Sequence, residues 1–280
     1  MRDIDAKKIT ETIKQLCIKA NYELSEDVLH ALTMSLGKES SRAGKEVIRD
    51  IVKNAEIARR NGYPICQDTG MAVVFAEVGQ DVRIVNGDLD AAINEGVKRA
   101  YKEGYLRKSI VNDPFMRRNT GDNAPAMIHH HIVPGDKIKL TLMAKGGGAE
   151  NKSSFKMFKP TAGREEIMGF IMDIVKNAGG DACPPLIIGI GIGGNLEGSA
   201  LLAKKALLRK VGQKNRDRDT AKFEARVLKE LNDSGIGPGG LGGDITALSV
   251  AIEKAPCHIA SLPVTVNMDC HAHRVRHEVI

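Results

Sequence analysis

The sequence lacks any apolar run long enough to span a membrane, and its first residues, 1–8, contain no apolar core of the kind found in a secretory signal. Aromatic residues make up only 4% of the chain, with six Phe, four Tyr and no Trp. The basic residues form neither a tract nor a patch interleaved with aromatic residues, so nucleic-acid binding is not expected despite a formal net charge of +6. We expect a cytoplasmic protein with no membrane partner.

Three of the five cysteines stand beside turn-forming and polar residues: Cys66 in Ile-Cys-Gln-Asp-Thr-Gly, Cys183 in Ala-Cys-Pro-Pro, and Cys270 in Asp-Cys-His-Ala-His. They lie far apart along the chain and form no zinc or ferredoxin motif of closely spaced cysteines, so only the fold could bring them together. Cysteines of a reducing compartment are more often buried, metal-bound or catalytic than disulfide-linked. Three thiolates suit a four-iron cluster with one open iron, and the alternative is three ordinary buried thiols.

The remaining cysteines and a run of histidines are assigned structural roles. Cys17 falls within a helical pattern and Cys257 within a strand-like segment, so both are expected to pack in the interior. The run from His129 to His131 resembles a metal-binding tract, but adjacent side chains of a strand point to opposite faces.

The first 62 residues are predicted to be helical. The chain has 280 residues, of which 42% are hydrophobic, enough for a sizeable core. Apolar residues recur at helical spacing over 9–20, 29–36 and 48–55, and Gly62 with Pro64 should end the third helix.

The rest of the chain is predicted to mix strands and helices. A strand over 71–78 should be followed by a helix that Asp88 caps, and then by a hairpin of 127–133 and 137–143. The second half should contain a helix over 164–178, a strand over 186–192, helices over 196–211 and 221–231, and final strands. We therefore predict a mixed α/β (α+β) fold with one domain, 1–280, in which a helical layer, 1–62, packs on a sheet-containing body, 63–280.

Two glycine-rich stretches follow predicted strands. Gly189 to Gly194 superficially resembles a dinucleotide-binding loop, but its spacing is not the usual fingerprint, so tight packing of a strand on a helix is favoured. A nucleotide-binding or purely structural subunit organised around it remains the alternative. In the stretch from Lys145 to Lys152, consecutive glycines would let backbone amides approach an anion, although a flexible loop has the same composition.

Taken together, these motifs resemble the alpha subunit of the class I fumarate hydratases and of the related L-tartrate dehydratases, over most of the chain. The motifs that carry the resemblance are Ile65 to Gly70, Leu106-Arg107, Asn119-Thr120-Gly121, Lys145 to Lys152, Ala182 to Pro185, His258, and Pro263-Val264 leading into Cys270. The resemblance implies a hydro-lyase with a [4Fe-4S] cluster held by Cys66, Cys183 and Cys270. Its reaction would be the reversible hydration of fumarate to L-malate, with dehydration of L-tartrate as the alternative.

The resemblance also implies roles for individual residues. Asp68 would protonate the hydroxide that leaves during dehydration, whereas its position before Thr-Gly alone would indicate a loop-capping aspartate. His258 would be a second catalytic residue near the site, either supporting it or relaying a proton, unless it is simply a buried histidine. The residues implied to bind substrate are Gln67, Asp68, Arg107, Gly148, Asn151 and Lys152. The histidines His271, His273 and His277 could orient the third cysteine or lie at a subunit interface.

The resemblance extends only to the first half of the single-chain members of this family. In those enzymes the other half brings further arginines, a lysine and the base. We therefore expect a beta subunit in trans, assembly as a dimer or heterotetramer, a small dicarboxylate substrate, and little or no activity from this chain alone.

Overall fold

The structure, a computed structural model, describes residues 1–280 and divides into two compact units. The first unit comprises Met1–Ser25, Ala55–Gly147 and Arg274–Ile280, and the second comprises Glu26–Asn54 and Gly148–His273. The predicted mixed α/β fold class is confirmed. The sequence predicts one domain with a separate layer of N-terminal helices, whereas α1 (Ala6–Tyr22) belongs to the first unit, α2 (Glu26–Ser35) to the second, and α3 (Arg42–Asn61) to both.

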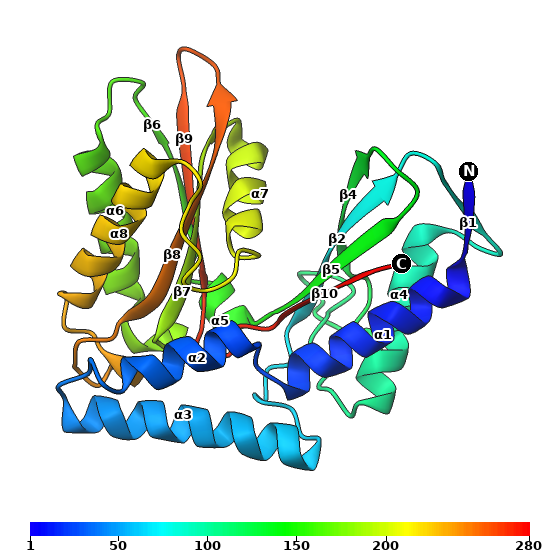
Figure 1. The fold of residues 1–280 in the computed structure, drawn as a ribbon, viewed down its shortest axis with the longest axis horizontal. Coiled ribbons are helices and arrows are strands. Elements are labelled where there is room, and N and C mark those ends of the chain that lie inside the picture. Colours follow the sequence, from blue (N-terminus) through cyan, green and yellow to red (C-terminus); the bar gives the residue numbers. More distant parts are fainter. The chain divides into compact units, whose positions relative to one another are not determined.

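The first unit is a four-stranded sheet covered by two helices (Figure 1). The sheet has the order β10-β5-β2-β4, and a separate two-stranded sheet pairs β1 with β3. Side chains of α1 and α4 form one core cluster with alternate residues of β2 and β5. Besides α1, the elements are β1 (Arg2–Asp5), β2 (Met71–Gly79), β3 (Val82–Val85), α4 (Leu89–Glu103), β4 (Met127–Val133), β5 (Ile138–Lys145) and β10 (Val275–Val279).

The helix limits follow local signals in the sequence. The carboxylate of Asp5 accepts a hydrogen bond from the amide of Lys7 at the start of α1, and Asp88 caps α4 as predicted by accepting one from Ala91. Gly62, with a φ of 65°, follows the last residue of α3. The two aspartate contacts satisfy amide groups that the start of a helix leaves unpaired.

The predicted hairpin of β4 and β5 is wrong in its pairing, although both strands exist. The central strand β2 lies between them, pairing in parallel with β4 and antiparallel with β5. At the end of β2, Gly79 donates to the carbonyl of Lys137, and a Cβ on Gly79 would lie 2.3 Å from the carbonyl oxygen of Gly135. The turn does reverse the chain, but β2 is the more buried neighbour, so each strand pairs with β2 instead.

The second unit is a sheet of order β6-β9-β7-β8 with helices on both faces (Figure 1). Apolar side chains of α6 and α8 pack against Ile188 and Ile190 of β7 on one face. Besides α2, the elements are α5 (Gly147–Glu150), β6 (Ser154–Phe158), α6 (Arg164–Ala178), η1 (Gly179–Ala182), β7 (Leu186–Gly194), α7 (Leu196–Ala206), α8 (Arg218–Asn232), η2 (Pro238–Gly240), β8 (Ala247–Cys257) and β9 (Leu262–Asp269).

The glycines of β7 serve the close packing predicted for them. A Cβ on Gly189 would lie 2.2 Å from the carbonyl oxygen of Ala203, and one on Gly191 would lie 2.0 Å from that of Ser199. Both carbonyls belong to α7, which therefore packs backbone to backbone on this face of β7. Gly189 and Gly191 therefore serve helix packing within β7 and are not part of a nucleotide-binding turn. Asn195 caps the helix that follows.

A buried carboxylate holds the segment between α2 and α3 against the loop that precedes β8. Glu39, only 2% exposed, accepts hydrogen bonds from the backbone amides of Ser41, Asp244 and Ile245. We expect Glu39→Ala to lower the free energy of unfolding by about 3 to 5 kcal/mol, because three amides lose a charged acceptor. Urea unfolding would measure the change. The exposed Glu46 of α3 is the control, and a Glu39→Ala effect no larger than that of Glu46→Ala would contradict this role.

Candidate functional site

The loop that carries Cys66, Gln67 and Asp68 is fixed by hydrogen bonds on both sides within the first unit. Before it, the amide of Ile65 donates to the carbonyl of Asn21 at 2.8 Å. After it, the hydroxyl of Thr69 donates to the carbonyl of Arg107 at 2.7 Å. These hydrogen bonds hold the backbone of the loop in place. The side chains of Cys66 and Gln67 are exposed, and that of Asp68 is half-buried.

Asp68 joins this loop to the glycine-rich stretch. Its Oδ1 accepts a hydrogen bond from the amide of Gly70 at 3.0 Å, as in a loop-capping aspartate. Its Oδ2 accepts one from the amide of Gly147 at 2.7 Å. Two motifs that are distant in sequence thus meet at one carboxylate, and each of its oxygens retains a lone pair for a further ligand.

A buried tyrosine of α4 supports the same loop. The hydroxyl of Tyr101 lies 2.7 Å from the carbonyl oxygen of Thr69 and 2.8 Å from that of Gly70, and Asn123 Nδ2 donates to the latter at 3.2 Å. Burial raises the pKa of Tyr101, so the phenol stays protonated as a donor. Sequence analysis missed both residues, because neither stands in a recognisable motif.

We expect Tyr101→Phe to lower the free energy of unfolding by about 1 to 3 kcal/mol, because the change deprives buried carbonyl oxygens of a donor without removing the ring. Thermal or urea unfolding would measure it. Tyr22→Phe is the control, since Tyr22 also donates to a backbone carbonyl, that of Gly104, but lies only partly buried. Equal losses in the two variants would contradict a special role for the Tyr101 hydroxyl.

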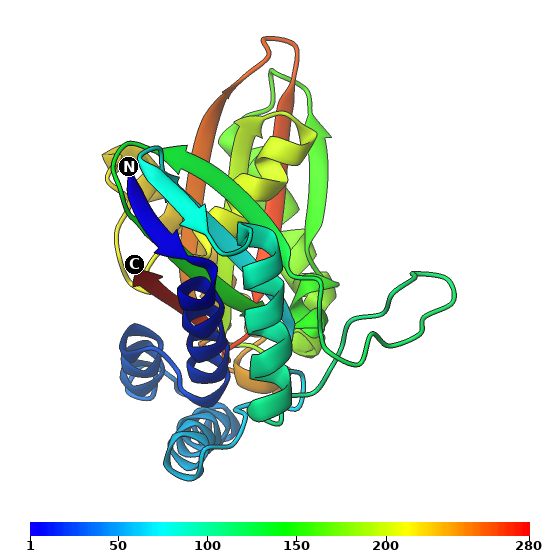
Figure 2. The same cartoon turned by 90° about the vertical axis from the view of Figure 1, so that its right-hand side faces the viewer.

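Arg107 lies beside this loop through its backbone, which accepts the bond from Thr69. Its side chain is exposed, while the preceding Leu106 is buried in the core. It stands just beyond α4, at the start of the long segment between α4 and β4, which extends away from the helix in Figure 2. The guanidinium is therefore exposed to solvent, and the role of Arg107 in binding a carboxylate stays a prediction.

In the second unit, Cys183 and Cys270 lie on adjacent loops. Cys183 ends η1 just before β7, and Cys270 follows the last residue of β9. Because β7 and β9 are antiparallel, these two positions fall at the same end of the sheet. His271 links them directly: its amide lies 3.3 Å and its Nδ1 3.0 Å from the carbonyl oxygen of Cys183.

The chain leaving Cys270 is held by a buried carboxylate–histidine pair. Nδ1 of His273 lies 2.6 Å from Oδ2 of Asp269, and both side chains are almost fully buried. The pair spans Cys270 and fixes the turn on which it stands. His271 and His273 thus orient this segment, one of the two roles predicted for them, whereas His277 lies on β10.

The glycine-rich stretch reaches the same loops in the second unit. Residues 147–150 form the single turn α5, where sequence analysis predicted only a loop. A Cβ on Gly148 would lie 3.6 Å from the carbonyl oxygen of Asp181, and Nζ of Lys152 lies 2.7 Å from the carboxylate of Asp181. Asp181 belongs to η1, which leads into Cys183. Gly148 and Lys152 therefore lie beside the Cys183 loop, and the neighbouring Asn151 is exposed.

Within the second unit, His258 is not brought to Cys183 and Cys270. It lies exposed on the turn between β8 and β9, where its Nδ1 accepts a hydrogen bond from the amide of Ala260. The eight residues of β9 separate this turn from Cys270, a distance of about 25 Å along a strand. The alternative of a buried histidine is wrong.

The other cysteines and the histidine run have mixed outcomes. Cys17 packs in the core as predicted, and burial raises the pKa of its thiol. Cys257 is exposed at the end of β8, so its assignment to packing is wrong. His129 stacks on Phe75 with ring centroids 4.8 Å apart, and His130 lies 2.7 Å from Asp90, contacts that agree with a structural role.

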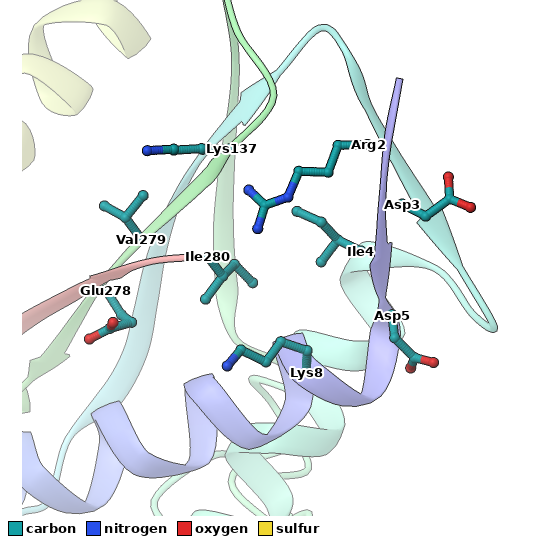
Figure 3. A pocket seen from close by; sticks show the side chains of 9 residues that line it. All are labelled: Arg2, Asp3, Ile4, Asp5, Lys8, Lys137, Glu278, Val279 and Ile280. Carbon is teal, nitrogen blue, oxygen red and sulfur yellow. The ribbon is translucent and has the colours of Figure 1, made fainter.

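A pocket of about 550 Å³ lies elsewhere in the first unit (Figure 3). Its lining includes Arg2, Lys8, Lys137 and Glu278, charged residues of both signs. It lies at the start of β5, whereas Lys145, next to the Asp68 contact, is the last residue of β5. The pocket is therefore separate from the loop of Cys66.

No group of three or more His, Cys, Asp or Glu side chains is placed so that it could hold a single metal ion. The candidate site is therefore described by two sets of residues, one in each unit.

None of the helices combines the length and apolar composition that crossing a membrane requires.

Comparison with known proteins gives consistent matches along nearly the whole chain. A family described as Fumarate hydratase (Fumerase) matches residues 10–279. A Methanocaldococcus jannaschii protein, provisionally named L(+)-tartrate dehydratase subunit alpha, is 42% identical over 273 residues, or 95% of each chain. Proteins named L(+)-tartrate dehydratase subunit alpha from Escherichia coli and Shigella boydii are each 30% identical over 270 residues, which cover 95% of this chain and 89% of theirs.

Proposed function

Because this chain belongs to the fumarate hydratase family, we propose that it is the alpha subunit of an iron–sulfur hydro-lyase acting on a four-carbon dicarboxylate. The predicted family and enzyme class are confirmed by this membership, since hydration of a double bond and its reversal are hydro-lyase reactions. The observation that carries the further proposal is the convergence of Cys183, Cys270 and the Gly148–Lys152 segment at one end of the second unit.

We assign Cys66, Cys183 and Cys270 as the ligands of a [4Fe-4S] cluster. The donor chemistry suits the group, because three thiolates leave one iron without a protein ligand. Cys183 and Cys270 stand on loops joined by His271, and Cys66 and Cys183 are exposed in loops whose backbones are held by hydrogen bonds. When bound, such a cluster supplies a Lewis acid for the hydroxyl group of the substrate.

Asp68 is the residue we assign to proton transfer. Its carboxylate stands two residues after Cys66 and is held by the amides of Gly70 and Gly147, which fix its direction. In dehydration, its protonated form would give a proton to the departing hydroxide, and in hydration the carboxylate would accept one from water. The capping bond to Gly70 is compatible with this role, because it uses only one lone pair of Oδ1.

We assign Gln67, Arg107, Gly148, Asn151 and Lys152 to the binding of substrate carboxylates. Arg107 and Gln67 have exposed side chains in the first unit, and Gly148, Asn151 and Lys152 supply donors in the second. Lys152 already pairs with Asp181, so an incoming carboxylate would have to share or replace that partner. The carboxylate of Asp181 is exposed, and an ion pair with an exposed carboxylate contributes little to stability, so this exchange costs little free energy.

His258 has no place among the residues of the second unit that we assign to the cluster. His258 lies at the opposite end of β9 from Cys270, so we assign it no role that requires contact with Cys270. We therefore keep it outside the catalytic set of this proposal.

A beta subunit would complete the enzyme. The relatives in Escherichia coli and Shigella boydii are named as alpha subunits, and they are matched over 89% of their length. We propose a heteromeric assembly, a dimer or heterotetramer, in which the partner supplies the base and further cationic groups. The reducing cytoplasm is the compartment that suits the thiolate ligands.

Two substrates fit the proposal. Fumarate and L-malate are the pair predicted from the sequence, while the names of the relatives favour L(+)-tartrate. Both are four-carbon dicarboxylates, and one extra hydroxyl distinguishes tartrate from malate. Residues that read this hydroxyl would lie largely in the partner.

The experiment is an anaerobic assay of this chain alone and with a beta subunit of the same family, on fumarate, L-malate and L(+)-tartrate. We expect turnover of one substrate by the pair, with at most a trace from this chain alone. Full turnover without a partner would contradict the two-subunit assembly. An iron-loaded pair that is inactive on all three compounds would overturn the proposed reaction.

A further inference from the structure

Arg274 is a buried arginine behind the loop of Cys66 and Asp68. It is 1% exposed, although it is charged, and it opens the segment that returns to the first unit and continues into β10. Its Nη1 donates to the backbone carbonyl of Asp68 at 2.6 Å and to Oδ1 of Asn21 at 3.1 Å. Sequence analysis assigned it no role, because the sequence alone does not distinguish a buried arginine from a surface one.

The arginine and its asparagine partner hold the loop on both sides of Cys66. The backbone carbonyl of Asn21 accepts the amide of Ile65, the residue before Cys66. Its side-chain amide donates to the carbonyl of Cys17 in α1 and so fixes the asparagine on the helix. The Cys66 segment is therefore anchored at Ile65 and at Asp68 to one rigid helix.

The charge of Arg274 lies close to the Asp68 carboxylate. A Cβ built on Gly146 would lie 3.2 Å from Nη2 of Arg274 and 3.4 Å from Oδ2 of Asp68, so both groups flank the same glycine. The hydrogen bonds of Nη1 go to two neutral oxygens, and Nε is buried without a hydrogen-bond partner. Burying a guanidinium in this way costs several kcal/mol of desolvation free energy, so the contribution of Arg274 to stability does not by itself explain its position.

We propose that Arg274 is a positioning residue for the reaction: it fixes the direction in which Cys66 and Asp68 leave their loop and places a positive charge behind them. The inference rests on the proposed function for the roles of Cys66 and Asp68. It assigns Arg274 no contact with substrate. The bond to the Asp68 carbonyl is the contact through which it acts.

The test compares Arg274→Met and Arg274→Lys with Arg276→Met. Arg276 is a matched control, because it lies on β10 and also donates to backbone carbonyls, those of Val275 and Glu23, which lie outside the loop. The first readout is hydrogen–deuterium exchange of a peptide covering 65–70 in the metal-free chain, with a β5 peptide as internal reference. Iron and sulfide per chain after anaerobic reconstitution, and kcat and KM of the assembled enzyme, are the others.

For Arg274→Met we expect exchange of the loop amides to rise about tenfold or more, because a charged hydrogen bond is lost. Iron retention and kcat should fall, while KM changes less, since the substrate-binding residues remain. Arg274→Lys should recover part of each loss, and Arg276→Met should resemble the wild type. If Arg274→Met does not fold, the lysine variant gives the same comparison.

Unchanged loop exchange in both Arg274 variants, with normal iron and kcat, would overturn the inference. Equal changes in the Arg276 control would overturn it as well, because they would indicate a general effect on β10. A wild-type chain that binds no iron would overturn the proposed function, and the positioning role with it. In that case, faster loop exchange in the arginine variants would still identify Arg274 as a purely structural anchor.

Discussion

Anaerobic reconstitution of Cys183→Ser or Cys270→Ser is expected to yield little or no iron, compared with about four irons per wild-type chain. The two residues stand on loops joined through His271, so a serine at either position removes one of the proposed thiolate ligands without changing the backbone that carries it. Cys66→Ser should have the same effect from the first unit. Iron and acid-labile sulfide analysis would measure each loss.

Cys257→Ser is the matched control for these variants. Cys257 is also an exposed cysteine of the second unit, but it lies at the end of β8, near the turn that carries His258. The control should bind iron like the wild type. Full iron binding by any of the three ligand variants would remove that cysteine from the ligand set, and iron loss in Cys257→Ser would indicate adventitious binding to exposed thiols.

Asp68→Asn is expected to lower kcat by about 10²- to 10⁴-fold while the chain still binds iron, because the amide cannot transfer the proton. Asparagine has nearly the same shape and keeps an oxygen for only one of the two amides, that of Gly70 or that of Gly147. Its NH₂ group must then face the other amide, which costs about 1 to 3 kcal/mol of stability. Kinetics of the assembled enzyme, together with iron analysis and urea unfolding, would separate the two effects.

Asp113→Asn controls for the capping function. Asp113 also accepts the amide of the second residue after it, Phe115, but stands in the exposed segment between α4 and β4. We expect a small loss of stability and unchanged kcat. If Asp68→Asn lost stability in the same way and kept its kcat, Asp68 would be a loop cap and no more.

Local patterns predicted the elements well and their pairing poorly. The spacing of apolar residues located α1, α6 and β7, and Asp88 marked the start of α4. The pairing of β4 with β5 failed because a turn reverses the chain whether or not its strands become neighbours. The insertion of β2 depends on burial across the whole sheet, which a local pattern does not contain.

The candidate site was predictable as separate motifs but not as an arrangement. The three proposed ligands Cys66, Cys183 and Cys270, and also Asp68, stand in recognisable local sequences, whereas the bond from Gly147 to Asp68 joins distant segments. Tyr101, Asn123 and Arg274 contribute through buried hydrogen bonds to backbone carbonyls, and such contacts leave no signature in sequence. The distance of His258 from Cys270 follows from the length of β9, once the strand is known.

The return of the chain from the second unit to the first has a consequence for the order of biosynthesis. Arg274 and β10, which complete the first unit, are translated after Cys66, Cys183 and Cys270. A nascent chain therefore lacks both the anchor on the Asp68 carbonyl and the β5 partner strand until every cysteine has been made. Iron delivered before β10 is made would meet a Cys66 loop that is still without this support, so in the proposed enzyme cluster insertion would follow the synthesis of β10.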